Sequence, residues 1–182
     1  MRPAARRLAA SRAAALAVAV AAAPLALPAQ TLDLPPRKAG LWELSTRIEK
    51  PQATPPLVAQ MCLDSATDRD LMSYALKLTD GTCKKLTSKR EGKALVIEAE
   101  CAVAKKVSKT RTEITGDLQS AYTMRTEGSL EGGSKGPQTM LTTQTATWKG
   151  ENCLDMKPGD ISLFGGVKMN INQLKALSGL IR

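Results

Sequence analysis

Paired carboxylates are the residues of this chain with the clearest potential for chemistry. Glu98 lies two residues from Glu100, and Asp155 lies five residues from Asp160. Two carboxylates at a suitable separation can hydrolyse a glycosidic bond. Glu98 and Glu100, however, alternate with apolar residues in an extended segment, which favours a solvent-facing position opposite lysines. The pairs are therefore interpreted as surface charges.

Other catalytic patterns are missing from the sequence. The chain of 182 residues contains no histidine, which removes the usual general base and the usual ligand of transition metals. No GxSxG, phosphate-loop or dinucleotide-binding motif is present. We therefore predict that the protein is not an enzyme and that it uses no cofactor and no metal.

Four cysteines are the remaining reactive side chains: Cys62, Cys83, Cys101 and Cys153. None of their spacings matches a redox or metal-binding motif. An even number of cysteines in an exported chain predicts two disulfides.

The pairing of these cysteines follows from a predicted hairpin. Arg90 to Lys93 form a turn whose Gly92 can adopt the positive φ that a hairpin needs. Centring the hairpin on Gly92 places Cys83 opposite Cys101 and Lys84 opposite Glu100, which leaves Cys62 to pair with Cys153. Bulged and unbulged turns both fit, so this register is defined to within about one residue.

Export is indicated by residues 1–29. Four arginines precede an apolar run, Ala13 to Ala23, and a segment rich in proline and alanine follows it. This is the pattern of a secretory signal peptide, and we predict cleavage after Ala29, with Ala26 as the second choice. The run is shorter than the roughly 20 residues of a transmembrane helix. The mature protein, a single domain over 30–182, is expected in the periplasm without a transmembrane segment.

The charge of the mature chain is modest. Removing the four arginines of the leader leaves 22 basic and 17 acidic side chains, a net charge of +5. With one Phe, two Trp and two Tyr in the whole chain, few rings can stack on bases, so specific nucleic-acid binding is disfavoured. Eight basic residues gather around the first hairpin, either as a solvated strand edge or as a patch for an anionic partner: Lys84, Lys85, Lys89, Arg90, Lys105, Lys106, Lys109 and Arg111.

A mainly β fold with minor α structure is predicted from hydrophobic periodicity. Alternating segments predict strands at 40–49, 57–63, 84–89, 95–103, 106–115, 120–126 and 138–149, with a turn near 116–117 and a glycine-rich loop over 128–137. A helix is predicted over 67–78, capped by Ser65 or Thr67. The strands form an antiparallel meander, as a curved sheet or a small barrel. A C-terminal helix over 168–182 is the candidate cover of its inner face.

Three large side chains lie on the apolar sides of their strands. Trp42 alternates with polar residues near the mature start, and Met140 and Trp148 share one face of the last long strand. They are interpreted as part of the core or of a ligand-binding face, and core is favoured for the tryptophans.

These residues resemble a known family. The resemblance rests on Ala39 to Thr46, Gln60 to Leu63, Tyr122 to Thr126, Ala146 to Gly150 and the order of the cysteines. It covers about residues 38–160 and is to DUF3617, an exported bacterial domain of unknown function. The resemblance implies a Gram-negative periplasmic setting and an antiparallel β fold, and no activity. The segment 156–182 extends beyond the family pattern.

Two hypotheses of function follow. The first is a non-catalytic binding module for an apolar or lipid-like ligand, or for a partner in the cell envelope. The second is a structural or stress-linked envelope protein with no small-molecule site. The inner face of the sheet discriminates between them, because a binding module needs space that its own side chains do not fill.

Overall fold

The computed structural model describes residues 34–133, 136–163 and 166–179. The predicted signal peptide lies outside these residues. The described chain forms the following elements in order: β1 Gly40–Lys50, β2 Leu57–Leu63, α1 Ser65–Thr79, β3 Cys83–Glu91, β4 Ala94–Val103, β5 Lys106–Asp117, β6 Ala121–Glu131, β7 Gln138–Gly150, β8 Asp160–Ser162, β9 Lys168–Asn170 and α2 Ile171–Gly179. The predicted mainly β fold class is confirmed.

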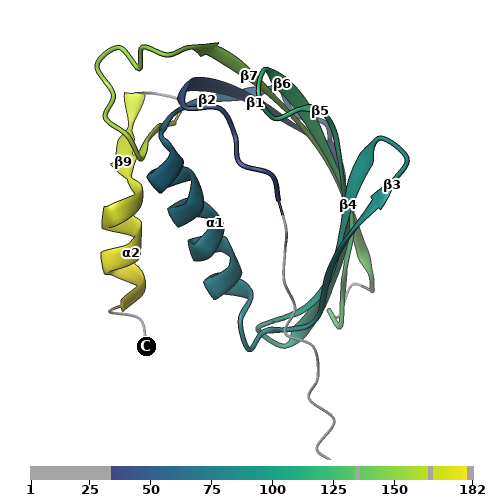
Figure 1. Ribbon diagram of the computed structural model, residues 1–182. Coiled ribbons are helices and arrows are strands. Elements are labelled where there is room, and N and C mark those ends of the chain that lie inside the picture. The colour runs from purple at the N-terminus through teal and green to yellow at the C-terminus, as the bar shows by residue number, and fades with distance from the viewer. Residues whose placement is uncertain (1–33, 134–135, 164–165, 180–182) are drawn as a thin grey trace, which may run out of the picture.

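All the described strands belong to one antiparallel sheet. Its order is β3-β4-β5-β6-β7-β1-β2-β8-β9, so β3 to β7 form the predicted meander and β1 pairs with the last of them. The sheet is not closed over the described residues, because β3 and β9 are its two ends. Of the two shapes that the sequence allowed, the structure is the curved sheet, and Figure 1 shows it curving around α1.

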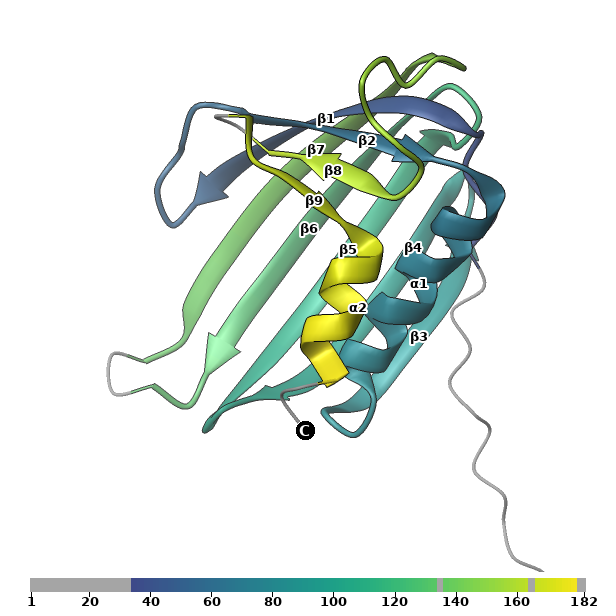
Figure 2. The ribbon, with the colours of Figure 1, turned by 90° about the vertical axis from the view of Figure 1, so that its left-hand side faces the viewer.

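Both helices lie on the concave side of the sheet, which we call the inner face (Figures 1 and 2). The main core lies between this face and the start of α1, where Leu71 packs against it. Its buried members come from β1, β2, β4, β5, β6 and β7: Trp42, Leu44, Met61, Leu63, Leu95, Ile114, Tyr122 and Ala146. The core therefore fills one end of the curved sheet rather than its full length.

Helix α1 begins with a capping box. Asp64 Oδ1 accepts hydrogen bonds from the backbone N–H groups of Ala66 and Thr67, and the backbone N–H of Asp64 donates to Thr67 Oγ1 at 2.9 Å. The predicted caps are wrong, because Ser65 is the first residue of the helix and Thr67 is its third. The Asp64 carboxylate and the Thr67 hydroxyl thus bond to backbone N–H groups that the first helical turn leaves without a partner.

The first hairpin differs from its predicted register. Glu91 pairs with Ala94, so Gly92 and Lys93 form a two-residue loop, and Lys85 rather than Lys84 lies opposite Glu100. A register shift between Cys83 and Lys85 absorbs the difference and restores Cys83 to its place opposite Cys101. A bulge of this kind inserts one residue on one strand without changing the rest of the ladder.

Two segments predicted as turn or loop are strand instead. β5 continues through 116–117, and β6 continues through Gly128 to Glu131. A Cβ atom at Gly128 would lie 3.0 Å from Met140 Cγ and 3.2 Å from the carbonyl oxygen of Lys109. Glycine is present in this strand because neighbouring atoms approach its backbone closely.

The C-terminal segment forms part of the cover, but the first three residues of the predicted helix over 168–182 form a strand. Residues 168–170 form β9 and α2 begins at Ile171, whose side chain is fully buried. Lys175 of α2 forms an ion pair with Asp70 of α1, which joins the two helices. Residues 180–182 lie outside the described structure.

Candidate functional site

The glutamates of the first predicted carboxylate pair lie on the outer, convex face and bind lysines. Lys84 Nζ lies 2.7 Å from Glu100, and Lys85 Nζ lies 2.6 Å from Glu98. Hydrogen bonds from these lysines lower the pKa of both carboxyl groups. A general acid needs the opposite shift, so the geometry offers these residues no acid role.

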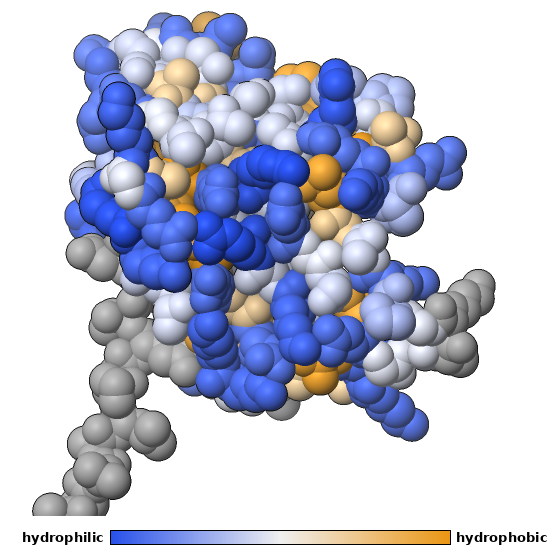
Figure 3. Space-filling view, turned by 90° about the vertical axis from the view of Figure 1, so that its right-hand side faces the viewer, coloured by the Kyte–Doolittle hydropathy of each residue, from blue (hydrophilic) through white to orange (hydrophobic). Residues whose placement is uncertain are grey.

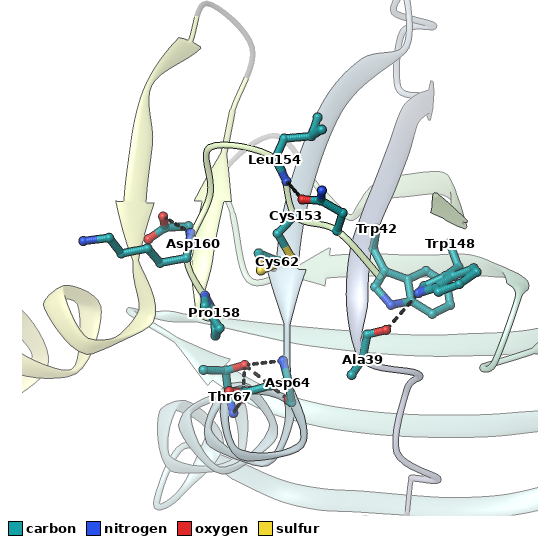
Figure 4. Close-up of a disulfide and its surroundings, with 12 residues drawn as sticks. Ala39, Trp42, Cys62, Asp64, Thr67, Trp148, Cys153, Leu154, Pro158 and Asp160 are labelled. Carbon is teal, nitrogen blue, oxygen red and sulfur yellow. Dashed lines mark hydrogen bonds between the residues drawn. A yellow bond between two sulfur atoms is a disulfide. The ribbon is translucent and has the colours of Figure 1, made fainter. Parts of the chain in front are cut away.

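The aspartates of the second pair shape a surface turn. Asp155 forms an ion pair with Lys168. Asp160 Oδ2 accepts a hydrogen bond from the backbone N–H of Lys157, and Oδ1 accepts one from Asn170 Nδ2, each at 2.8 Å. These bonds hold the turn that leads into β8, near the disulfide shown in Figure 4.

An ionic network covers the outer face of β3, β4 and β5. Arg111 Nη2 lies 2.6 Å from Glu91 and 3.0 Å from Glu113. Hydrogen bonds from Arg111 and Lys89 lower the pKa of Glu91 to about 2. Val96, which pairs with Lys89 and Glu113, is only 1% exposed. The network therefore shields an apolar side chain on the solvent face.

The predicted basic cluster is largely neutralised by this network. Among the described residues, five of its eight cations form ion pairs, and their partners are five glutamates: Glu91, Glu98, Glu100, Glu113 and Glu131. Figure 3 shows the side of the molecule that carries β3 and β4, where the surface is mainly hydrophilic. Balanced charge favours a solvated strand edge over a docking patch for an anionic partner.

The two tryptophans hold the start of β1 in place. Trp42 is fully buried, and its indole N–H donates to the carbonyl oxygen of Lys38 at 2.8 Å. The indole N–H of Trp148 donates to the carbonyl oxygen of Ala39 at 2.9 Å (Figure 4). The ammonium group of Lys38 lies 3.6 Å from the centre of the Trp148 ring. Both side chains are thus occupied by the protein itself.

Both disulfides join the predicted pairs, although a bulge rather than the predicted register brings Cys83 opposite Cys101. Cys83 is bonded to Cys101, and Cys62 is bonded to Cys153, with no free cysteine among the described residues. Cys62 packs with Leu41 and Met156 in a small second core on the outer face. The second disulfide therefore ties the 151–159 segment to β2, as Figure 4 shows.

A buried ion pair that the sequence analysis did not identify closes the core end of the inner face. Arg37 Nη2 lies 2.7 Å from Asp68 Oδ1, and the backbone N–H of Arg37 donates to Asp68 Oδ2 at 3.0 Å. Arg37 Nη1 also donates to the Tyr122 hydroxyl at 3.4 Å. The pair joins residues 31 positions apart, and no local pattern marks it.

The opposite half of the inner face is open. We call it the distal half, and it ends at the β4–β5 and β6–β7 turns. Figure 2 shows β5, β6 and β7 extending past both helices toward these turns. Six large apolar side chains are exposed in the described chain, and register places three of them on this face: Leu57 at 42%, Val103 at 51% and Met140 at 41%.

Two rows of paired residues form the floor of this distal half, which we call the inner trough. The first row runs across five strands and every member is partly exposed, and the second row lies nearer the turns. The rows are Ile97, Thr112, Thr126, Thr142 and Ile48, and then Leu86, Ala99, Thr110, Gly128 and Met140.

The floor of the inner trough is more apolar than its threonines suggest. The hydroxyl groups of Thr112 and Thr126 lie 2.9 Å apart and hydrogen-bond to each other. The Thr110 methyl carbon and Met140 Cγ lie where a side chain on Gly128 would be. Because the hydroxyl groups of this pair bond to each other, Thr112 and Thr126 need no polar partner from a ligand.

A pocket adjoins the inner trough where the end of α1 meets β3. Its volume is about 450 Å³, and Leu76, Asp80, Cys83 and Leu86 are among its lining residues. Small-molecule sites occupy roughly 300 to 1,000 Å³. Because Leu86 also belongs to the second row of the trough, pocket and trough form one surface.

Within the described part of the chain, no group of three His, Cys, Asp or Glu side chains is placed to hold a metal ion. No helix there is long and apolar enough to cross a membrane. The two disulfides are typical of proteins that fold outside the reducing cytoplasm.

Comparison with known proteins identifies a family but no activity. No curated protein and no solved structure matches the chain. A family model described as "Protein of unknown function (DUF3617)" matches residues 37–153. The match begins at Arg37 of the buried ion pair and ends at Cys153 of the second disulfide, so β8, β9 and α2 lie beyond it. Since the model covers more than half of the sequence, the chain belongs to the DUF3617 family.

Proposed function

We propose that this protein is a non-catalytic binding module that carries an apolar, lipid-like ligand in the inner trough. The observation that carries the proposal is the open distal half of the inner face. An uncovered part of an antiparallel sheet normally presents polar side chains to water. Here apolar side chains such as Val103 and Met140 remain exposed on the concave side.

A ligand with an alkyl chain would gain most from this surface. Burying apolar surface stabilises a complex by roughly 25 cal/mol per Å² removed from water. The paired hydroxyl groups of Thr112 and Thr126 have no need of a polar partner from the ligand. A sugar or nucleotide would lose hydrogen bonds to water on this floor without replacing them.

The proposed setting is the periplasm, reached through a cleaved signal peptide. The arginine-rich, apolar and small-residue parts of 1–29 support export, and the two disulfides suit an oxidising compartment. Sequencing the N-terminus of the protein from the periplasmic fraction tests this step, and retention of residues 1–29 would contradict it.

The absence of catalysis is part of the same proposal. It is supported by the lack of histidine and by the ion-paired, surface positions of Glu98 and Glu100. A broad hydrolase screen checks it. Turnover abolished by a substitution of Glu98, Glu100, Asp155 or Asp160 would refute it.

A matched pair of variants on β7 tests binding in the inner trough. Thr142 faces the trough between Thr126 and Ile48, whereas Thr145 of the same strand faces outward and is exposed. We expect Thr142→Phe to fill the trough and Thr145→Phe to leave it open. The full chain is expressed in a Gram-negative host, purified from the periplasm, and extracted for mass spectrometry of bound lipids.

The expected result is a lipid or fatty compound at near-equimolar ratio in the wild type and in Thr145→Phe, and its loss in Thr142→Phe. Circular dichroism of all three proteins shows whether each is folded. If the folded wild type carries no such compound and takes up none when it is offered, the protein is the alternative, a structural envelope protein without a small-molecule site.

A further inference from the structure

We propose that the ligand of the inner trough is a single-chain amphiphile with an anionic head group, and that Lys106 binds this head group. The inference rests on the proposed function and adds the charge of the ligand and its direction in the trough. The inference is based on one lysine that has no acidic partner among the described residues and lies at the open end of an apolar surface.

Lys106 lies at the turn end of the inner trough. It is the first residue of β5 and pairs with Val103 across the β4–β5 turn. Side chains alternate along a strand, so Lys106 shares the inner face with Thr110 and Thr112. A Cβ atom at Gly133 would lie 3.4 Å from Lys106 Cε and 3.5 Å from its Nζ, so the lysine chain reaches across the end of β6.

The electrostatics of this end differ from those of the outer face. Lys106 forms no ion pair with any residue that the structure describes, whereas nearby Lys109, on the outer face, contacts Glu131 at 2.9 Å. The two rows of the trough contain no charged residue. Arg90 also faces inward by register, but it lies opposite Leu95 at the core end. Lys77 of α1 lines the pocket beside β3. At the β4–β5 turn end of the trough, Lys106 is the inward-facing cation placed to meet an anion.

The dimensions suit a chain that lies along the strands. The six steps along the strand from Lys106 to Thr112 span about 20 Å at roughly 3.3 Å per residue of extended strand. An alkyl chain along this path would contact the methyl groups of Thr110 and Thr112 and the side chain of Met140. With its head group at Lys106, the tail would point toward the core end. The head group would then stay near solvent while the chain leaves it.

Charge-matched probes test this orientation. The exported full chain is stripped of bound lipid and titrated by calorimetry with dodecanoate, with dodecyltrimethylammonium and with butyrate, each below its micelle concentration. We expect dodecanoate to bind at least tenfold more tightly than the cationic probe of the same chain length, and butyrate to show no binding. Lys106→Gln should weaken dodecanoate binding about fivefold to tenfold, the effect of one charge-assisted contact.

Lys105→Gln is the matched control, because Lys105 lies in the β4–β5 turn next to Lys106 and outside both rows. Its dodecanoate affinity should equal that of the wild type, and circular dichroism of each variant checks folding. Equal binding of the two charged probes, or no effect of Lys106→Gln, would overturn the anionic head group and leave the proposed function intact. Failure of both long-chain probes to bind would overturn the inference together with the proposed function.

Discussion

Replacing Asp68 by alanine removes the partner of a buried arginine and should be strongly destabilising. The Asp68 side chain is 5% exposed and the Arg37 side chain is 15% exposed. Asp68 accepts hydrogen bonds from the guanidinium and the backbone N–H of Arg37. In Asp68→Ala, the Tyr122 hydroxyl at 3.4 Å would be the polar contact left to the guanidinium among those the structure shows.

The size of the effect follows from this burial. Removing one member of a buried ion pair costs about 3 to 5 kcal/mol, because the other charge stays out of water without compensation. The loss of a carboxylate from the first turn of α1 adds about 0.3 to 1 kcal/mol. The residual exposure of Arg37 reduces the cost, so we expect a total near 3 to 4 kcal/mol. With a urea m-value of about 2 kcal/mol/M, the midpoint should fall by about 1.5 to 2 M.

Urea unfolding with intact disulfides, followed by tryptophan fluorescence and far-ultraviolet circular dichroism, measures this change. Asp155→Ala is the surface control, because its pair with Lys168 is 78% and 42% exposed, and it should cost about 0 to 1 kcal/mol. The double variant Arg37→Met/Asp68→Leu buries no charge and should regain most of the stability. A loss in Asp68→Ala no larger than that of the surface control would refute the argument, as would a double variant as unstable as the single one.

Three further predictions concern the backbone, the disulfides and pH. Gly40→Ala should cost at least about 3 kcal/mol or prevent folding, because Gly40 has a φ of +126° and its new Cβ would lie 2.2 Å from the carbonyl oxygen of Gly150. Gly81→Ala should cost about 1 kcal/mol, because Gly81 has a φ of +71° but no atom within 4 Å of the new Cβ. Equal urea midpoints for the two variants would contradict this difference. Replacing Cys62 and Cys153 by alanine should cost about 1.4 kcal/mol more than replacing Cys83 and Cys101, because the sequence separations are 91 and 18 and loop-closure entropy grows with length. Urea unfolding of the two double variants measures the difference in stability, and the reverse order would contradict the prediction. Acid should weaken the outer ionic network: the pKa of Glu91 is about 2 in the folded protein against an ordinary value of 4.5, so its contribution is complete above pH 4.5 and is lost as the pH falls toward 2. Urea midpoints at pH 6 and pH 3 should therefore differ less for Glu91→Gln than for the wild type, and an unchanged difference would count against the network.

Local patterns in the sequence were sufficient to identify most of the strands and the fold class. Strand residues alternate between two faces, so Trp42, Leu44 and their neighbours predict β1 without knowledge of its partners. The pairing of Cys83 with Cys101 depends on one hairpin, and hairpins are formed by residues close in sequence. The family resemblance is of the same kind, because it rests on short segments and their order.

Only the tertiary structure decided how segments far apart in the sequence contact one another. The bulge at Lys84 corrects a register that turn chemistry leaves open by one residue, and Gly128 extends β6 because Met140 of the next strand lies across it. Arg37 and Asp68 meet only when α1 docks on the sheet. The inner trough exists because β5, β6 and β7 extend past both helices, although α1 itself ends close to the β4–β5 turn, next to β3. Coverage of a sheet depends on how far its partners reach in space, and no periodicity along one strand contains that information.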